Sequence, residues 1–259
     1  MPEKGSYLYG VVASKEAADL GEVGLDGLKV YSVLYKNIAA IVHNCEAKAY
    51  SSDDKEVVGK WIVSHQGVVD KAWEKFGVIA PVAFDTVIKG GEKTLKSWLE
   101  ENYDTLVSEL TRFVGKAEYG IQIFWDVKKI SEEIIGQDEE LLELQKLIKA
   151  SSAGIAYLHK KKMEQILKTR LEEKSFNFFK SAYDTIKEMT NDIVIEKLKP
   201  ATDGLQMLMN ISCLVSKKKA KRLGELLDEI NKAGYPVRFT GPWPPYSFVG
   251  KKGKLEAGS

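Results

Sequence analysis

Apolar residues in the first 115 positions change their spacing several times, which predicts strands and helices in one domain. Short β-branched and aromatic runs predict strands, and Lys36-Asn37 predicts a hairpin turn because Asn tolerates a positive φ. Steps of three and four predict two amphipathic helices, the first opened by a capping pair of Asp53 and Glu56. The predicted strands are Tyr7–Val12, Leu28–Tyr35, Ile38–His43 and Val78–Phe84, and the predicted helices are Asp53–Phe76 and Leu95–Phe113.

The rest of the pattern predicts the order β-α-β-β-α-β, which is the ferredoxin-like split βαβ arrangement. Its predicted elements are a strand at Tyr119–Val127, an extended helical region at Gln137–Met189, strands at Asp192–Lys199 and Leu205–Val215, a helix at Ala220–Ile230 and a strand at Tyr235–Phe239. The helical region contains no Pro, so we expect either two helices joined near Glu173-Lys174 or one long bent helix.

These patterns predict an α+β fold with two domains, which suits a chain of 259 residues. We place an N-terminal α+β domain at residues 1–115 and a C-terminal ferredoxin-like domain at residues 116–250. Residues 251–259 are rich in Gly and Lys and have no apolar period, so a flexible tail is expected there.

The charge balance bears on the choice of partner. The chain has 38 basic and 37 acidic residues, a formal net charge of +1, which argues against bulk electrostatic binding to nucleic acid or to a membrane surface. The longest apolar runs fall far below the roughly 18 residues of a membrane-spanning helix, and no secretory signal is apparent. Two cysteines, Cys45 and Cys213, favour reduced thiols in a cytoplasmic protein.

Candidate catalytic residues are few. His65 lies on the apolar stripe of its predicted helix and is interpreted as a core histidine. His43 and Cys45 could supply two metal ligands or a nucleophile and its base, but strand residues two apart share a face without any chemistry, and no second pair accompanies them. The sequence therefore predicts no enzyme activity, no metal and no cofactor.

An RNA- or ligand-binding ferredoxin-like module remains the alternative. Such sheets bind RNA through stacked aromatics, and Phe124 and Trp125 lie on the first strand of the second domain. The lysine runs at 160–162 and 217–219 could contact phosphates, although both lie on predicted helices among acidic residues, as solvated faces do.

One segment near the C-terminus is unusual in composition. Residues 240–248 combine three prolines with three aromatic residues, and proline stiffens the backbone into an extended strap. The strap could bury its rings against the body of the protein, or present them as a rigid binding surface. Burial is favoured, and the two uses are compatible if only some rings are buried. The candidate residues are Arg238, Pro242, Trp243, Pro244, Pro245, Tyr246 and Phe248.

The same segment carries a family resemblance. Residues 237–249 resemble the C-terminal hallmark of the GvpF/GvpL family of gas vesicle proteins. Weaker similarities occur in the same order along the chain at residues 7–12, 81–86, 115–120, 157–160 and 210–215. The chain departs from the family at Ala83 and Asp85, where Arg and Gly are usual.

The resemblance implies an accessory protein of gas vesicle assembly with two α+β domains, the second related to the ferredoxin fold. It implies binding to the main gas vesicle shell protein and to other gas vesicle accessory proteins, in the cytoplasm and at the gas vesicle. A shell subunit with exposed apolar faces would aggregate unless a partner covered them. The strap and an unpaired strand edge are the candidate contact surfaces.

Overall fold

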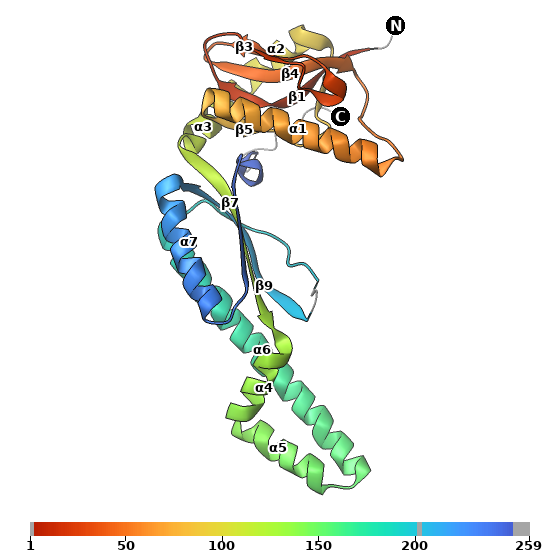
Figure 1. Ribbon diagram of the computed structural model, residues 1–259, viewed down its shortest axis with the longest axis vertical. Coiled ribbons are helices and arrows are strands. Elements are labelled where there is room, and N and C mark those ends of the chain that lie inside the picture. Colours follow the sequence, from red (N-terminus) through yellow and green to blue (C-terminus); the bar gives the residue numbers. More distant parts are fainter. Residues whose placement is uncertain (1–2, 201–203, 251–259) are drawn as a thin grey trace. The chain divides into compact units, whose positions relative to one another are not determined.

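The computed structural model describes residues 3–200 and 204–250, which form two compact units (Figure 1). The first unit comprises residues 3–118, 214–217 and 241–250, and the second comprises 119–213 and 218–240, without the undescribed residues 201–203. The tail expected at 251–259 lies outside the described residues.

A six-stranded sheet forms the centre of the first unit. Its strands are β1 (Lys4–Ala13), β2 (Asp19–Gly21), β3 (Val30–Tyr35), β4 (Ile38–Glu46), β5 (Ile79–Pro81) and β6 (Val87–Lys89). They run in the order β2-β3-β4-β1-β5, and β6 also pairs with β1. Strand β1 is antiparallel to β4, with Tyr7 opposite His43, and also to β5 and β6. Eight of its ten residues are buried, so both of its faces are covered.

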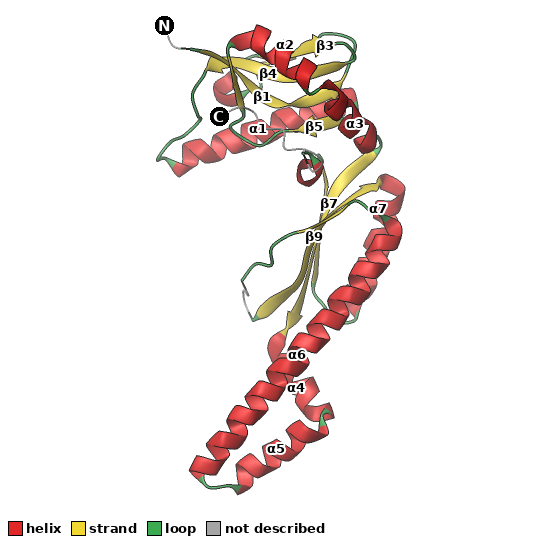
Figure 2. Ribbon diagram, turned by 180° about the vertical axis from the view of Figure 1, so that it is seen from behind, coloured by secondary structure: helices red, strands yellow, loops and turns green. Residues whose placement is uncertain are grey.

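Helices cover the two faces of this sheet (Figure 2). Helix α1 (Lys55–Phe76) packs on one face, and α2 (Gly91–Glu101) lies on the other, followed by α3 (Tyr103–Phe113). The cap of α1 is Asp54, not Asp53 as expected: its carboxylate accepts a hydrogen bond from Glu56 N at 2.8 Å. The single helix expected at 95–113 is interrupted at Asn102, which has a φ of −102° and a ψ of 5°. Its backbone N at 3.1 Å and its side-chain Nδ2 at 2.8 Å both donate to Trp98 O, which ends α2.

The second unit is built on a four-stranded sheet with a long helical excursion. Its elements are β7 (Lys116–Asp126), α4 (Val127–Gln137), α5 (Glu139–Ala150), α6 (Ala153–Met189), β8 (Ile193–Ile195), β9 (Leu205–Ser216), α7 (Lys217–Lys232) and β10 (Val237–Trp243). The strand order is β10-β7-β9-β8, which leaves β10 and β8 at the edges.

The helical excursion breaks at other places than expected. Helix α6 continues through 173–174 for 37 residues, the helical region begins with α4 at Val127 and not at Gln137 as expected, and its breaks fall at Asp138 and at Ser151-Ser152. Asp138 caps α5 by accepting from Leu141 N at 3.2 Å and pairs with Arg170 of α6 at 2.9 Å. Helices α5 and α6 therefore form an antiparallel hairpin (Figure 1).

Strand β8 is shorter than the predicted 192–199 segment. Beyond Ile195, the chain is held partly by side chains of β9, because Asn210 Nδ2 donates to Lys197 O at 2.7 Å and Met207 Sδ accepts from Lys199 N at 3.4 Å. Side-chain contacts of this kind replace the ladder of a regular strand.

Two buried histidines lie in the core of the first unit, His43 on β4 and His65 on α1. His65 Nε2 faces Val82 O at 3.2 Å, and a carbonyl only accepts, so the neutral ring carries its proton there and accepts from Tyr7 OH at Nδ1, 2.9 Å away. His43 lies between Tyr9 OH at 2.8 Å and Tyr50 OH at 3.0 Å. Burial lowers the pKa of each ring to about 4. These partners fit the interpretation of His65 as a core histidine.

Acidification is expected to destabilise the first unit through these rings. The unfolded chain protonates His43 and His65 near pH 6.5, whereas the folded chain resists protonation until about pH 4. The stability that the neutral rings contribute is complete above pH 6.5 and is lost as the pH falls to 4, by up to about 3 kcal/mol for each ring. Urea unfolding, followed at several pH values, measures this loss.

The matched control is His159→Gln, which is expected to leave the pH dependence unchanged because His159 lies outside this core. A double substitution of His43 and His65 by Gln should flatten the curve between pH 6.5 and 4. An unaltered slope in the double variant would contradict the assignment.

Candidate functional site

The proline-rich strap divides into exposed and buried residues. Arg238 and Pro242 are exposed, and Trp243 keeps 47% of its surface in solvent. Pro244, Pro245 and Phe248 are buried, Phe248 to 2%, in or beside the short 3-10 turn η2 (Tyr246–Phe248). Tyr246 is half-buried and packs against the core cluster that contains Tyr7 and Tyr9. Parts of the strap thus serve packing, and Trp243 remains available.

Three side chains of the first unit, two of them acceptors and one a donor, hold the end of the strap by hydrogen bonds. The Glu118 carboxylate accepts from Ser247 N at 2.8 Å and from Ser247 Oγ at 2.6 Å. Glu109 Oε1 accepts from Gly250 N at 2.7 Å, and Arg112 Nη2 donates to Phe248 O at 3.0 Å. We call Glu109, Arg112 and Glu118, with residues 244–250 that they hold, the clasp.

The clasp is electrostatically unusual because its carboxylates are buried. Glu109 and Glu118 are 6% and 8% exposed. Burial raises the pKa of Glu109, while the Gly250 N–H and the Arg112 guanidinium oppose that rise. The guanidinium also lies 5.1 Å from the centre of the Phe113 ring and 6.0 Å from that of Phe248. Buried charges of this kind need such partners to be stable.

Sequence reasoning missed the three clasp side chains. Glu118 was part of the 115–120 similarity, but the pattern did not indicate what it binds. Glu109 lies between Leu106 and Phe113 on the apolar stripe of α3, and a carboxylate on such a stripe is the signal that could have found it. The domain membership of the strap also differs from the expectation. Residues 241–250 group with the first unit, whereas the boundaries predicted from the sequence placed them in the C-terminal domain.

The departure at Asp85 has a local explanation. Its φ is 67°, in the left-handed region where Gly is favoured and Asp is tolerated. The Asp85 carboxylate accepts from Tyr50 N at 2.7 Å, and Asp85 N donates to Tyr7 OH at 3.0 Å. Asp therefore fits at a position where the resemblance implied Gly, and its side chain adds a hydrogen bond.

The candidates for other chemistry occupy structural positions. Within residues 3–200 and 204–250, no cluster of three or more His, Cys, Asp or Glu side chains could hold a metal ion. Trp125, considered for RNA stacking, is 2% exposed and donates to Gln206 Oε1 at 3.0 Å. Lys161 and Lys162 pair with Glu164 and Glu140 at 2.8 and 2.9 Å. No helix of the described chain is long and apolar enough to span a membrane.

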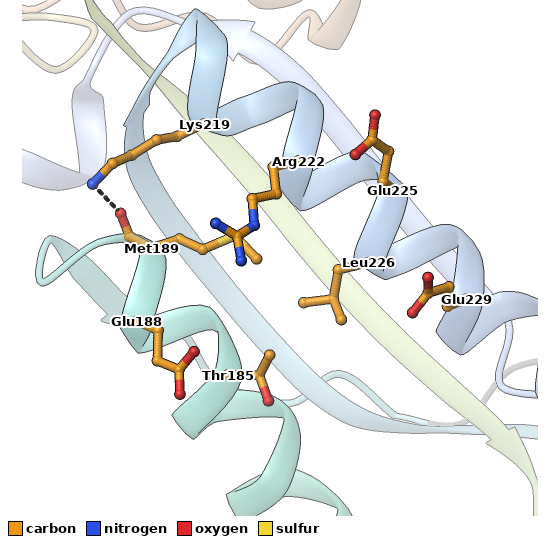
Figure 3. Close-up of a pocket in the computed structure, with 8 residues that line it drawn as sticks. All are labelled: Thr185, Glu188, Met189, Lys219, Arg222, Glu225, Leu226 and Glu229. Atoms are coloured by element: carbon orange, nitrogen blue, oxygen red, sulfur yellow. Dashed lines mark hydrogen bonds between the residues drawn. The ribbon is translucent and has the colours of Figure 1, made fainter.

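A concavity of about 440 Å³ lies between the end of α6 and α7 (Figure 3). Lys219 Nζ donates to Met189 O at 2.5 Å, which caps the C-terminus of α6 with a positive charge. Arg222 and the carboxylates of Glu188 and Glu225 share the rim. The mixed charges fit helix packing and do not converge on one ligand.

The two sheets and the helices that accompany them define a protein of mixed helix and sheet. The fold matches the crystal structure of the gas vesicle protein GvpF from Anabaena sp. PCC7120, with a TM-score of 0.77 at 19% identity over 95% of this chain and 98% of the other. GvpF from Microcystis aeruginosa gives a TM-score of 0.65 at 18% identity over 94% and 98%. At these identities, the matches show the fold alone.

Sequence comparison gives the family. The model of the gas vesicle synthesis protein GvpL/GvpF family matches residues 5–250, and the chain belongs to this family. Gas vesicle protein L1 of Halobacterium salinarum is 36% identical over 96% of this chain and 92% of its own length. Gas vesicle protein L of Haloferax mediterranei is 33% identical over 89% and 74%. The resemblance read from the strap is thereby confirmed, and the chain has a role in the gas vesicle system.

Loss of the Glu118 carboxylate should loosen the strap. Glu118→Ala removes the acceptor of both Ser247 bonds, so we expect the free energy of unfolding to fall by about 2–4 kcal/mol and amide hydrogen exchange at 247–250 to quicken. Ser247→Ala removes only the hydroxyl bond and should cost about 1 kcal/mol. Chemical denaturation and hydrogen-exchange mass spectrometry measure both effects.

The control for this series is Glu101→Ala, which removes an exposed carboxylate at the end of α2 in the same unit. It should change the unfolding free energy by less than about 0.5 kcal/mol. Equal losses for Glu118→Ala and Glu101→Ala would show that the clasp bonds add nothing to stability.

Proposed function

We propose that this chain is an accessory protein of gas vesicle assembly that binds the hydrophobic main shell protein and other accessory proteins, and that it catalyses no reaction. The observation that carries the proposal is the contrast within the strap: Phe248 is 2% exposed, while Trp243 five residues earlier is 47% exposed. A large aromatic ring on a backbone that is already anchored loses little entropy when it is covered, and such rings dominate binding energy in protein interfaces.

We further infer that the second unit is a ferredoxin-like domain carrying an inserted helical hairpin. The strand order β10-β7-β9-β8, with helices between the first and second strands and between the third and fourth, supports this inference. The edge position of β10, whose residues 240–243 are also the start of the strap, leaves this strand open to pairing with an extended segment of a partner. A location in the cytoplasm and at the gas vesicle is part of the same proposal.

The alternative, an RNA- or ligand-binding ferredoxin-like module, has less support. Of the two rings considered for stacking on a base, Trp125 lies in a cluster with Ile130 and Leu208, and Phe124 is partly exposed on the same strand. Salt-sensitive RNA binding without retention of shell protein would favour the alternative.

Replacing Trp243 tests the proposal. Trp243→Ala is expected to leave the circular dichroism spectrum and melting temperature nearly unchanged, because half the ring is in solvent. Affinity for the purified main shell protein should fall by about 2 kcal/mol, or roughly thirtyfold in Kd, and vesicle formation should fall in a strain that depends on this protein. Pull-down and electron microscopy of vesicles provide the readouts.

Two further variants make this result interpretable. Ile62→Ala removes a side chain of similar exposure, 49%, on α1 of the same unit and should leave both binding and vesicles unchanged. Phe248→Ala empties a buried site and should destabilise the fold by about 3–5 kcal/mol. If Trp243→Ala binds shell protein as well as the wild type does, the strap has a structural role only and is not a contact surface.

A further inference from the structure

The edge strand β10 differs from the other edge strands in length and exposure. It has seven residues, of which six are exposed, whereas β2, β5, β6 and β8 have three residues each. A lysine also covers part of the β2 edge, because Lys71 Nζ donates to Leu20 O at 2.8 Å. Proteins usually shorten or cover their sheet edges in such ways, because unpaired backbone groups attract another strand.

Two contacts fix how β10 pairs with its neighbour β7. Phe124 N donates to Pro236 O at 2.8 Å. Further along, a Cβ at Gly120 would lie 2.8 Å from Thr240 Oγ1, so these two residues are also opposite each other. The strands are therefore antiparallel, and the even-numbered residues of β10 form the hydrogen bonds to β7. The N–H and C=O groups of its odd-numbered residues point to the open side.

Residues 237–240 of β10 belong to the second unit and leave three backbone groups open. Val237 N lies on the open side and donates to Asn231 Oδ1 at 3.3 Å, which agrees with this register. The other groups on this side are Val237 O, Phe239 N–H and Phe239 O, and none of them has a hydrogen bond to residues 3–200 or 204–250. Groups with this spacing pair with the backbone of an added β-strand.

Packing of the Phe239 side chain holds this edge in an extended conformation. The ring stacks on Tyr119 of β7, with ring centroids 5.4 Å apart and an interplanar angle of 18°. A Cβ at Gly224 of α7 would lie 3.7 Å from the same ring. The side chain is still 36% exposed, so an apolar side chain on an added strand could cover the rest. An edge that is already extended loses little entropy when a strand pairs with it.

The charge of Arg238 favours an acidic residue on the added strand. Its side chain is exposed and forms no ion pair with the described residues. On β7, Gln122 lies opposite, and Gly120 and Phe124 lie on the diagonals, so its cross-strand neighbours are uncharged. Opposite charges on adjacent strands attract and like charges repel. An Asp or Glu beside Arg238 would thus be its first charged cross-strand partner.

A second copy of β10 fits this edge less well. Antiparallel pairing of two copies through the open groups of Val237 and Phe239 would place their two Arg238 side chains opposite or diagonal to each other on one face. Residues 237–240 contain no acid that could neutralise this pair. Like charges at such positions oppose pairing, so a different chain is favoured.

We propose that β10 binds an extended segment of another protein by strand addition, and that this segment carries an apolar residue beside Phe239 and an Asp or Glu beside Arg238. The inference rests on the proposed function, because it specifies the chemistry of a partner at the β10 edge. It requires only residues 237–240 and is independent of any contact made by Trp243.

Model peptides test the proposal on the full chain. The probe is an acetylated and amidated peptide of eight residues that alternates Val with Thr and has Asp in place of one central Thr. Nuclear magnetic resonance of the ¹⁵N-labelled protein should show saturable shifts of the amides at 237–240. The same peptide with Lys in place of Asp should bind about two- to fivefold more weakly. A peptide N-methylated at every internal residue should bind about tenfold more weakly or less, because it lacks the backbone donors.

Two substitutions at one position locate the binding. Phe239→Pro removes the outward N–H and no bond to β7, a position where edge strands tolerate Pro. Phe239→Ala removes the same ring and keeps the N–H. Binding of the Asp peptide should be about tenfold weaker for Phe239→Pro than for Phe239→Ala. Circular dichroism checks that both variants fold.

The Trp243→Ala variant separates this inference from the proposed function. It should bind the Asp peptide as the wild type does, while its affinity for the shell protein falls. Loss of shell-protein binding in Trp243→Ala, together with no peptide binding at 237–240 in the wild type, would leave the proposed function standing and overturn strand addition.

Four other results would overturn the proposal. Equal affinity of the N-methylated peptide would exclude backbone pairing, and this comparison needs no protein variant, so it decides even if Phe239→Pro does not fold. Equal affinity of the Lys peptide would exclude the acidic partner. Equal binding by Phe239→Pro and Phe239→Ala would place the peptide elsewhere. A dimer in sedimentation equilibrium that only Phe239→Pro abolishes would identify the occupant as a second copy of this chain.

Discussion

Buried carboxylates that accept hydrogen bonds from backbone N–H groups decide how the two ends of the first unit are joined. The chain leaves the first unit after Glu118, near the start of β7, and Ser247 belongs to the segment that rejoins the unit more than a hundred residues later. Two short hydrogen bonds join these two residues. Glu109 repeats the arrangement by accepting from Gly250 N, three residues after Ser247, and Arg112 donates to Phe248 O between them. A charged acceptor in a dry setting is strong when it is satisfied and costly when it is not, so these contacts fix the position of the strap.

The strap can combine packing and recognition because those demands fall on different residues. Pro244, Pro245 and Phe248 are buried and stiffen the backbone, and Trp243 directly before them keeps about half of its surface in solvent. In the second unit, the long helix α6 shows a similar division, since Ala182 and Ile186 near its end are buried whereas Phe176 is exposed. Both surfaces consist of exposed apolar side chains on a backbone held by neighbouring packing.

The sequence was sufficient for the mixed fold and the positions of most elements, because alternation and helical periodicity act locally. The α1 stripe, the strand around Met207–Val215 and the Gly77 stop are examples. Breaks at Asn102 and Asp138 were not predicted, because a single side chain that hydrogen-bonds to a nearby backbone group leaves the apolar period unchanged. The clasp was hidden for another reason: Glu109 and Glu118 meet their partners over sequence separations of 141 and 129, and no local pattern encodes such a pairing.

The late position of the clasp partners has a consequence for biosynthesis. The ribosome must translate the chain as far as Gly250 before Glu109 and Glu118 can accept the hydrogen bonds from Gly250 and Ser247. Until then, the first unit lacks the donors of these two carboxylates. A fragment cut after the first 118 residues carries the same deficit. Recombinant work on this unit would therefore require the C-terminal segment to be supplied, either in the intact chain or as a fused or added peptide.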